Sequence, residues 1–183
     1  MRETALFGYN LELKRTIRIP AMGAEITVCD ELSNLGFQPE EYALLYHCNF
    51  GFPFVSEDAH LELPEERKTS PRTPFAATDL GRETTFDKPT PGEEERVFFH
   101  ESMAHKAAIV NETIHTRVDL TWSDTLPILA HWRSMASGDY VCALEPTNCY
   151  IMGRKFEREN GTLPKLQSFE TLKTEVHFHF ETI

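Results

Sequence analysis

The segment at residues 44–53 places a histidine where it could transfer protons. His47 and Asn49 are two residues apart in an apolar segment, so on a strand the imidazole and the amide would project from one side. Gly51 and Pro53 then break the strand, as happens at the rim of a pocket. The alternative is a buried histidine that is hydrogen-bonded inside the core.

A second segment offers the carboxylate that such a histidine would need. Glu145 follows the apolar residues 140–144, and Pro146 removes a backbone donor directly after it. A carboxylate at the end of an apolar strand is costly unless it is paired or exposed. Partly apolar surroundings raise the pKa of a carboxyl group, which suits a general base. A surface glutamate at a strand end is the alternative.

Two further side chains could bind a ligand. Arg154 has a fork of donors that suits an anionic or polyhydroxylated ligand, and the alternative is a solvated arginine. Trp132 offers a flat surface on which a sugar could stack, and the alternative is a tryptophan of the core.

The sequence predicts no metal site and no cofactor. His177 and His179 fall on one face of an expected strand and could share a metal, but their spacing marks no third ligand. The motifs of serine hydrolases, P-loop proteins and dinucleotide-binding proteins do not occur. The four cysteines form no C-x-x-C motif and are expected to be free thiols, as in a reducing compartment.

Composition excludes several classes of partner. The 183 residues carry 18 Lys and Arg against 29 Asp and Glu, which gives a formal net charge of −11. Binding to nucleic acid or to an anionic membrane surface is therefore not expected. No apolar run approaches about 18 residues, the length that spans a bilayer. Residues 1–20 alternate polar with apolar and do not resemble a signal peptide, so we expect a cytoplasmic protein.

The elements that must position these residues are mostly strands. A period of two over residues 11–28, interrupted by a turn, predicts a hairpin, and residues 42–50 predict a strand buried on both faces. Residues 64–95 are rich in proline and charge and predict a long surface loop with one helical turn near Ala76. The short segments that follow are spaced as in an all-β antiparallel sandwich. We expect a single domain over residues 1–183.

Four ordered segments together resemble a known family. They are Leu45–Pro53, Leu126–Trp132, Glu145–Asn148 and Gly153–Arg154. In this order they are similar to a branch of the galactose mutarotase-like superfamily, which includes the aldose 1-epimerases.

The resemblance implies a fold and an activity. The fold would be a β-supersandwich that binds sugars on one concave sheet, and the chain would be a carbohydrate isomerase. Glu145 would be the base that takes the anomeric hydroxyl proton, and His47 the acid that protonates the ring oxygen. Asn49, Asn148 and Arg154 would contact a small-molecule sugar, and no cofactor would be needed.

The sequence also departs from the family. The second active-site histidine and the arginine of true mutarotases precede the part of the family domain that this chain resembles. The chain would then be a fragment, a reduced relative, or one that a partner completes, and its exposed strands would favour a homodimer. The alternative function is a non-catalytic carbohydrate-binding or structural domain.

Overall fold

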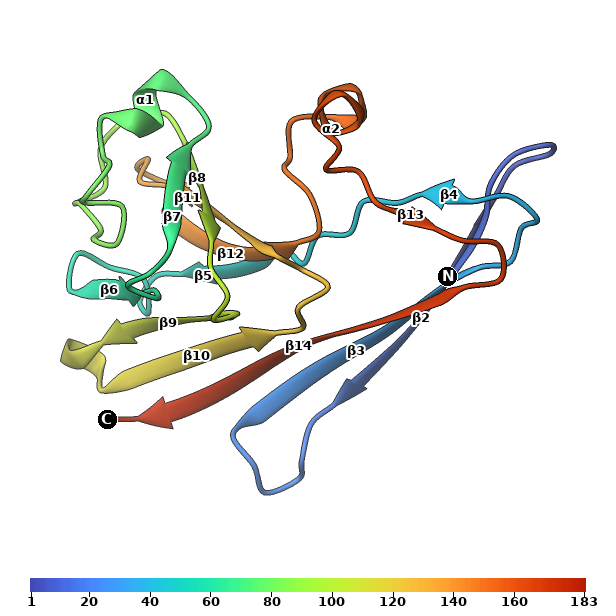
Figure 1. Cartoon of the computed structure of the whole chain (residues 1–183). Helices are drawn as coiled ribbons and strands as arrows, with labels where there is room; N and C mark the ends of the chain where they lie inside the picture. Colours follow the sequence, from blue (N-terminus) through green and yellow to red (C-terminus); the bar gives the residue numbers. More distant parts are fainter.

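Two antiparallel β-sheets pack face to face in the computed structural model, which describes residues 1–183 (Figure 1). The larger sheet has the order β1 (Arg2–Thr4), β2 (Asn10–Arg18), β3 (Glu25–Asn34), β14 (Thr171–Thr182), β10 (Thr116–Trp122), β9 (Lys106–Asn111), β6 (Ala59–Glu62). The smaller sheet has the order β5 (Cys48–Gly51), β12 (Val141–Thr147), β11 (Ile128–Ser134), β8 (Arg96–Glu101), β7 (Lys68–Pro71). The predicted all-β antiparallel sandwich is confirmed.

The remaining elements are short. β4 (Glu40–Glu41) and β13 (Lys165–Leu166) form a two-stranded pair, and Glu112–Ile114 is a 3-10 helix. The two α-helices are α1 (Pro74–Ala77) and α2 (Arg154–Asn160). Neither α1 nor α2 has the length and apolar character that crossing a bilayer requires.

The core lies between the two sheets because alternate residues of each strand point inward. Leu120 and Val176 come from the larger sheet, Leu129 and Leu144 from the smaller one, and all four belong to one buried cluster. Removing such side chains from water is the main favourable contribution to folding. The residues between them, such as Trp132 on β11, therefore point to the opposite faces of the sheets.

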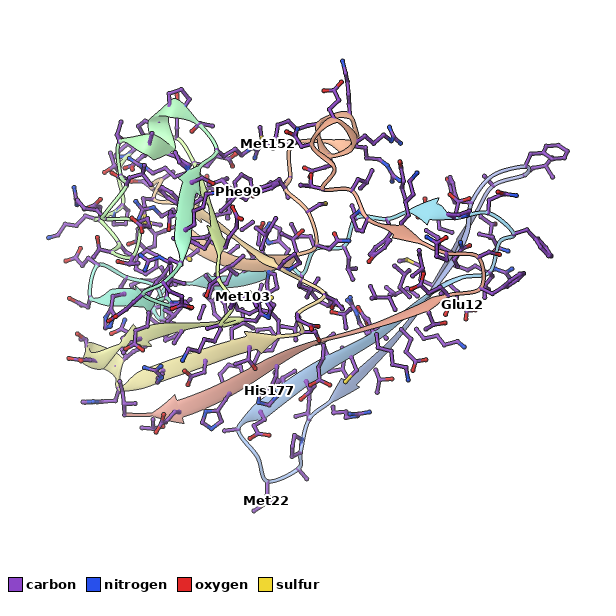
Figure 2. The ribbon with its side chains drawn as sticks, in the orientation of Figure 1. Glu12, Met22, Phe99, Met103, Met152 and His177 are labelled. Carbon is purple, nitrogen blue, oxygen red and sulfur yellow. The ribbon has the colours of Figure 1, made fainter.

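The predicted hairpin is confirmed as β2 and β3. Ile17 pairs with Val28 and Arg18 with Thr27, and the connecting turn carries the fully exposed Met22. This turn extends away from the smaller sheet (Figures 1 and 2).

The strand predicted over residues 42–50 is wrong in its first part. Only Cys48–Gly51 form the strand β5, although Leu45 still bridges to Thr147 in the same register. The ladder is interrupted between them because Pro146 accepts the Tyr46 N–H but has no N–H to donate in return. Two further polar contacts hold the segment before β5. The Leu44 amide donates to the side chain of Asn148 at 2.8 Å, and the Tyr46 hydroxyl donates to the buried Asp30 carboxylate at 2.7 Å. Together with the Leu45–Thr147 bridge, these bonds hold residues 44–46 beside the end of β12.

The segment at residues 64–95 has the predicted helical turn near Ala76, but it is more than a surface loop. β7 adds an edge strand to the smaller sheet, and the Thr73 hydroxyl caps α1. Asp79 is buried and forms ion pairs with Arg96 and Arg133, which are also buried. Ion pairs formed out of water fix this segment against β8 and β11.

Candidate active site

His47 and Glu145 meet on the face of the smaller sheet that points away from the core. Leu144 belongs to the core, so Glu145, the next residue of β12, points to the other face. Leu144 pairs with Cys48 of β5, which places His47 beside Glu145. The His47 Nε2 and Glu145 Oε1 atoms are 2.7 Å apart. The structure thus brings together the two residues singled out for proton transfer.

The two side chains differ in their surroundings. The Glu145 side chain is 3% exposed, whereas that of His47 is 50% exposed. Burial raises the pKa of the Glu145 carboxyl group, and the nearby His47 and Arg72 oppose this effect. The carboxylate of Glu95 adds to the upward shift. A buried carboxyl with a raised pKa next to an imidazole is an arrangement that can exchange protons near neutral pH.

Trp132 lies beside this pair. Its ring centroid is 6.0 Å from that of His47, and it is partly exposed rather than a residue of the main core. The indole Nε1 donates to Glu95 Oε2 at 2.7 Å, which fixes the plane of the ring. An indole held at the edge of a polar pair can provide a stacking surface for the apolar face of a sugar ring.

Two residues near the pair were missed by the sequence analysis, Arg72 and Glu95. The Arg72 amide donates to the Val97 carbonyl at 2.9 Å, which continues the pairing of β7 with β8. Both side chains line a hollow of about 400 Å³ next to Val97. No motif marks them, because only the register of β7, β8 and β11 brings them to Trp132 and Glu145. The only feature of the sequence that could have indicated Arg72 and Glu95 is that they lie in a polar, proline-rich segment before an apolar strand.

The three remaining candidates have different positions. Asn49 lies on β5 two residues after His47 and is exposed, so it shares the face of the pair. Asn148 is buried, and its amide oxygen accepts the Leu44 N–H in the segment that leads to His47. Arg154 begins α2, donates to the Glu41 carbonyl at 3.0 Å and lies near the Glu41 carboxylate. The structure therefore brings Asn49 and Trp132 to the pair and shows Asn148 and Arg154 bound to other parts of the chain.

Solved structures define the class of this fold. A Klebsiella pneumoniae protein described as a "putative aldose 1-epimerase" superposes with a TM-score of 0.91 at 24% identity, over 98% of this chain and 48% of that one. A galactose mutarotase-like protein from Clostridium acetobutylicum superposes with a TM-score of 0.68 at 16% identity, over 96% of this chain and 57% of that one. A galactose mutarotase-like protein from Lactobacillus casei superposes with a TM-score of 0.68 at 15% identity, over 99% of this chain and 68% of that one. The chain has the galactose mutarotase-like fold, as the resemblance implied.

The family is defined by sequence. Residues 1–180 match the family model described as "Domain of unknown function (DUF4432)", and the chain belongs to this family. A comparison with curated proteins finds no significant match. The chain spans about half the length of the Klebsiella pneumoniae protein that it superposes on.

Proposed function

We propose that this chain is a carbohydrate isomerase of the aldose 1-epimerase type, which interconverts the anomers of a sugar. The observation that carries the proposal is the 2.7 Å contact between His47 Nε2 and the buried Glu145 Oε1 beside Trp132. The likeness of the fold to galactose mutarotase-like proteins supports it.

The chemistry requires one base and one acid. Glu145 takes the proton of the anomeric hydroxyl while His47 gives a proton to the ring oxygen. The bond between the anomeric carbon and the ring oxygen breaks, and the open-chain aldehyde forms. After rotation about the neighbouring carbon–carbon bond, the hydroxyl attacks the other face of the aldehyde and both protons return. Each group ends in its starting state, so no oxidant or other co-reactant is consumed.

The sugar must separate the two side chains before it can react. His47 and Glu145 contact each other at 2.7 Å, so the anomeric hydroxyl and the ring oxygen would replace that contact. The exposed half of the His47 imidazole gives the sugar its access. Trp132 would lie against the apolar side of the ring, and the hollow beside Arg72 and Glu95 would accept its distal hydroxyls.

The experiment follows anomer exchange directly. The purified chain is added to freshly dissolved α-glucose or α-galactose, and the approach to equilibrium is followed by polarimetry and by NMR exchange between anomers. The parent should accelerate exchange over buffer for at least one sugar of a panel, and His47→Ala and Glu145→Gln should remove the acceleration. The matched control is His60→Gln, an exposed histidine on the larger sheet, which should behave as the parent. Parent rates equal to buffer for every sugar would exclude the isomerase.

One observation favours a second function, carbohydrate binding without catalysis. Asn148 and Arg154 bind groups of the chain itself, so of the three polar side chains expected to contact the sugar only Asn49 shares the face of the pair. In this case the same NMR spectra would show sugar-induced shifts of the Trp132 indole signal without anomer exchange. A purely structural domain would show neither effect.

A further inference from the structure

A group of potential metal ligands lies on the outer face of the larger sheet, away from the proposed active site. Val176 and Phe178 pack in the core, so the alternate residues of β14, His177, His179 and Glu181, point outward. Figure 2 shows His177 on the larger sheet, and Phe99 marks the smaller sheet. The outer face is therefore independent of the His47–Glu145 pair.

The register supplies carboxylate ligands for His179 that the spacing of the histidines did not mark. Asp119 of β10 pairs directly with His179 of β14, and Arg117 pairs with Glu181. Asp119, His179 and Glu181 each offer one donor atom, and these three atoms lie within 4.8 Å of one another. One imidazole nitrogen and two carboxylate oxygens form a donor set that zinc and similar divalent ions accept.

The distance between two of these donors also fits a shared ion. His179 Nδ1 and Asp119 Oδ2 are 3.8 Å apart, which is too long for a hydrogen bond. Two ligands that each lie about 2.0–2.2 Å from zinc are held about 3 to 4 Å apart. Glu181 is exposed at the end of β14, so its carboxylate can turn toward the same point.

Arg117 orients this group without neutralising it. Its guanidinium donates to Asp119, with Nη2 to Oδ1 at 2.8 Å, and pairs with Glu62 at 2.9 Å. Hydrogen bonds to a ligating carboxylate fix its direction, as the outer ligand shell of metal sites commonly does. The Arg117 guanidinium contacts the carboxylates of Glu62 and Asp119, and Glu181 lies opposite Arg117 in the strand register. Three carboxylates against one guanidinium leave the cluster a negative charge that attracts a cation.

We propose that Asp119, His179 and Glu181 bind a divalent transition-metal ion of the zinc type on the outer face of the larger sheet, with water completing the coordination. The ion would bridge β10 and β14 near the end of the chain. This site is separate from the isomerase proposal and does not depend on it.

The neighbouring histidine provides a matched control. His177 lies on the same strand face, two residues before His179, but its Nδ1 is hydrogen-bonded to the Thr27 hydroxyl at 2.9 Å. The structure assigns the metal to His179 and not to His177. The substitutions His177→Gln and His179→Gln remove the same imidazole from adjacent outward positions of one strand.

The test measures Zn²⁺ binding to the full chain. Metal-free protein is titrated with ZnCl₂ by calorimetry, and thermal melting is recorded with and without the ion. The parent should bind one ion per chain and melt at a higher temperature with Zn²⁺, because an ion that binds only the folded chain stabilises it. His179→Gln and Glu181→Gln should each weaken binding by about tenfold or more, and His177→Gln should bind as the parent does.

Every other result overturns the assignment. A parent that binds no Zn²⁺ stoichiometrically has no such site. Equal binding by the parent and His179→Gln would exclude the imidazole as a ligand, and equal loss in His177→Gln would place the ion elsewhere. Glu181→Gln is at an exposed strand end and keeps the test valid if His179→Gln proves unstable. Circular dichroism of each variant checks its fold.

Discussion

Trp132 donates its indole N–H to the carboxylate of Glu95 at 2.7 Å, and this bond joins the segment at residues 64–95 to the sheet that carries Glu145. Glu95 thus has two effects on the candidate site. It fixes the plane of the indole, and its negative charge raises the pKa of Glu145. Both effects can be separated by substitution.

The first prediction concerns the pH dependence of the proposed activity. Glu95→Gln keeps an acceptor for Trp132 but removes the charge, so the pKa of Glu145 should fall. The acid limb of kcat/KM against pH should therefore move to lower pH, with little change in KM. Trp132→Phe removes the donor and should raise KM without moving that limb. An unchanged acid limb in Glu95→Gln would mean that its charge does not act on Glu145.

The second prediction concerns the ion pairs that hold the segment at residues 64–95. The Asp79 carboxylate lies 2.9 Å from Arg96 Nε and also pairs with Arg133, whose side chain is 1% exposed. Asp79→Asn leaves a buried guanidinium without its counter-charge, so the free energy of unfolding should fall by about 3 to 5 kcal/mol. Urea denaturation measures the change.

A matched control distinguishes the loss of these buried ion pairs from the loss of an exposed acidic side chain. Asp87 forms an ion pair with Arg82 at 3.0 Å, but both side chains are at least half exposed. Asp87→Asn should change the free energy of unfolding by less than about 1 kcal/mol. If Asp79→Asn cost no more than Asp87→Asn, the buried pairs would not be what anchors this segment.

Part of the site was predictable because its signals are local in the sequence. The apolar run before Glu145 correctly predicted a buried strand, although β12 does not end at Pro146 and continues to Thr147. The alternation over residues 11–28 predicted the hairpin. His47 was expected within a strand but directly precedes one, because Pro146 lies opposite Tyr46 and has no N–H with which to continue the ladder. That pairing joins segments far apart in the chain, and no local pattern contains it.

The rest of the site depends on register between strands. Nothing in the spacing of Arg72 and Glu95 relates them to Glu145, since four strands of the smaller sheet must align before they meet. The same holds for Asp119, which lies opposite His179 only through the pairing of β10 with β14. The motif that singled out Arg154 was local, whereas its actual partner is Glu41 of β4, which belongs to a two-stranded pair that the sequence did not indicate.

The third prediction concerns stability in acid. His100 and His131 are buried side by side, with His100 Nε2 and His131 Nδ1 3.4 Å apart. Burial lowers the pKa of His100 to about 4, an effect that the charge of Arg67 increases, and burial also lowers the pKa of His131. Both imidazoles are therefore neutral in the folded protein at neutral pH.

The direction in which pH changes the stability follows from the lowered pKa values of these histidines. An unfolded histidine has a pKa of about 6.5, so between about pH 6.5 and pH 4 the unfolded chain binds more protons than the folded one. The free energy of unfolding should fall across this window by about 3 kcal/mol from His100 alone. Urea denaturation at several pH values should show a shallower fall for His100→Gln than for the parent. Parallel curves for the two proteins would contradict the prediction.

The last prediction separates two roles for Asn148, substrate contact and positioning. Its Oδ1 accepts the Leu44 N–H at 2.8 Å, and its own N–H donates to the Leu44 carbonyl at 3.1 Å, so it fixes the backbone that leads to His47. Asn148→Ala leaves the Leu44 donor without its partner, which should lower the free energy of unfolding by about 1 to 3 kcal/mol. Because His47 would then be less well placed against Glu145, kcat in the anomer-exchange assay should fall more than KM rises. Asn148→Asp keeps an acceptor oxygen and should recover part of kcat. A residue that only contacts sugar would give the opposite pattern, a higher KM with unchanged stability, and that result would restore Asn148 to the substrate-binding set.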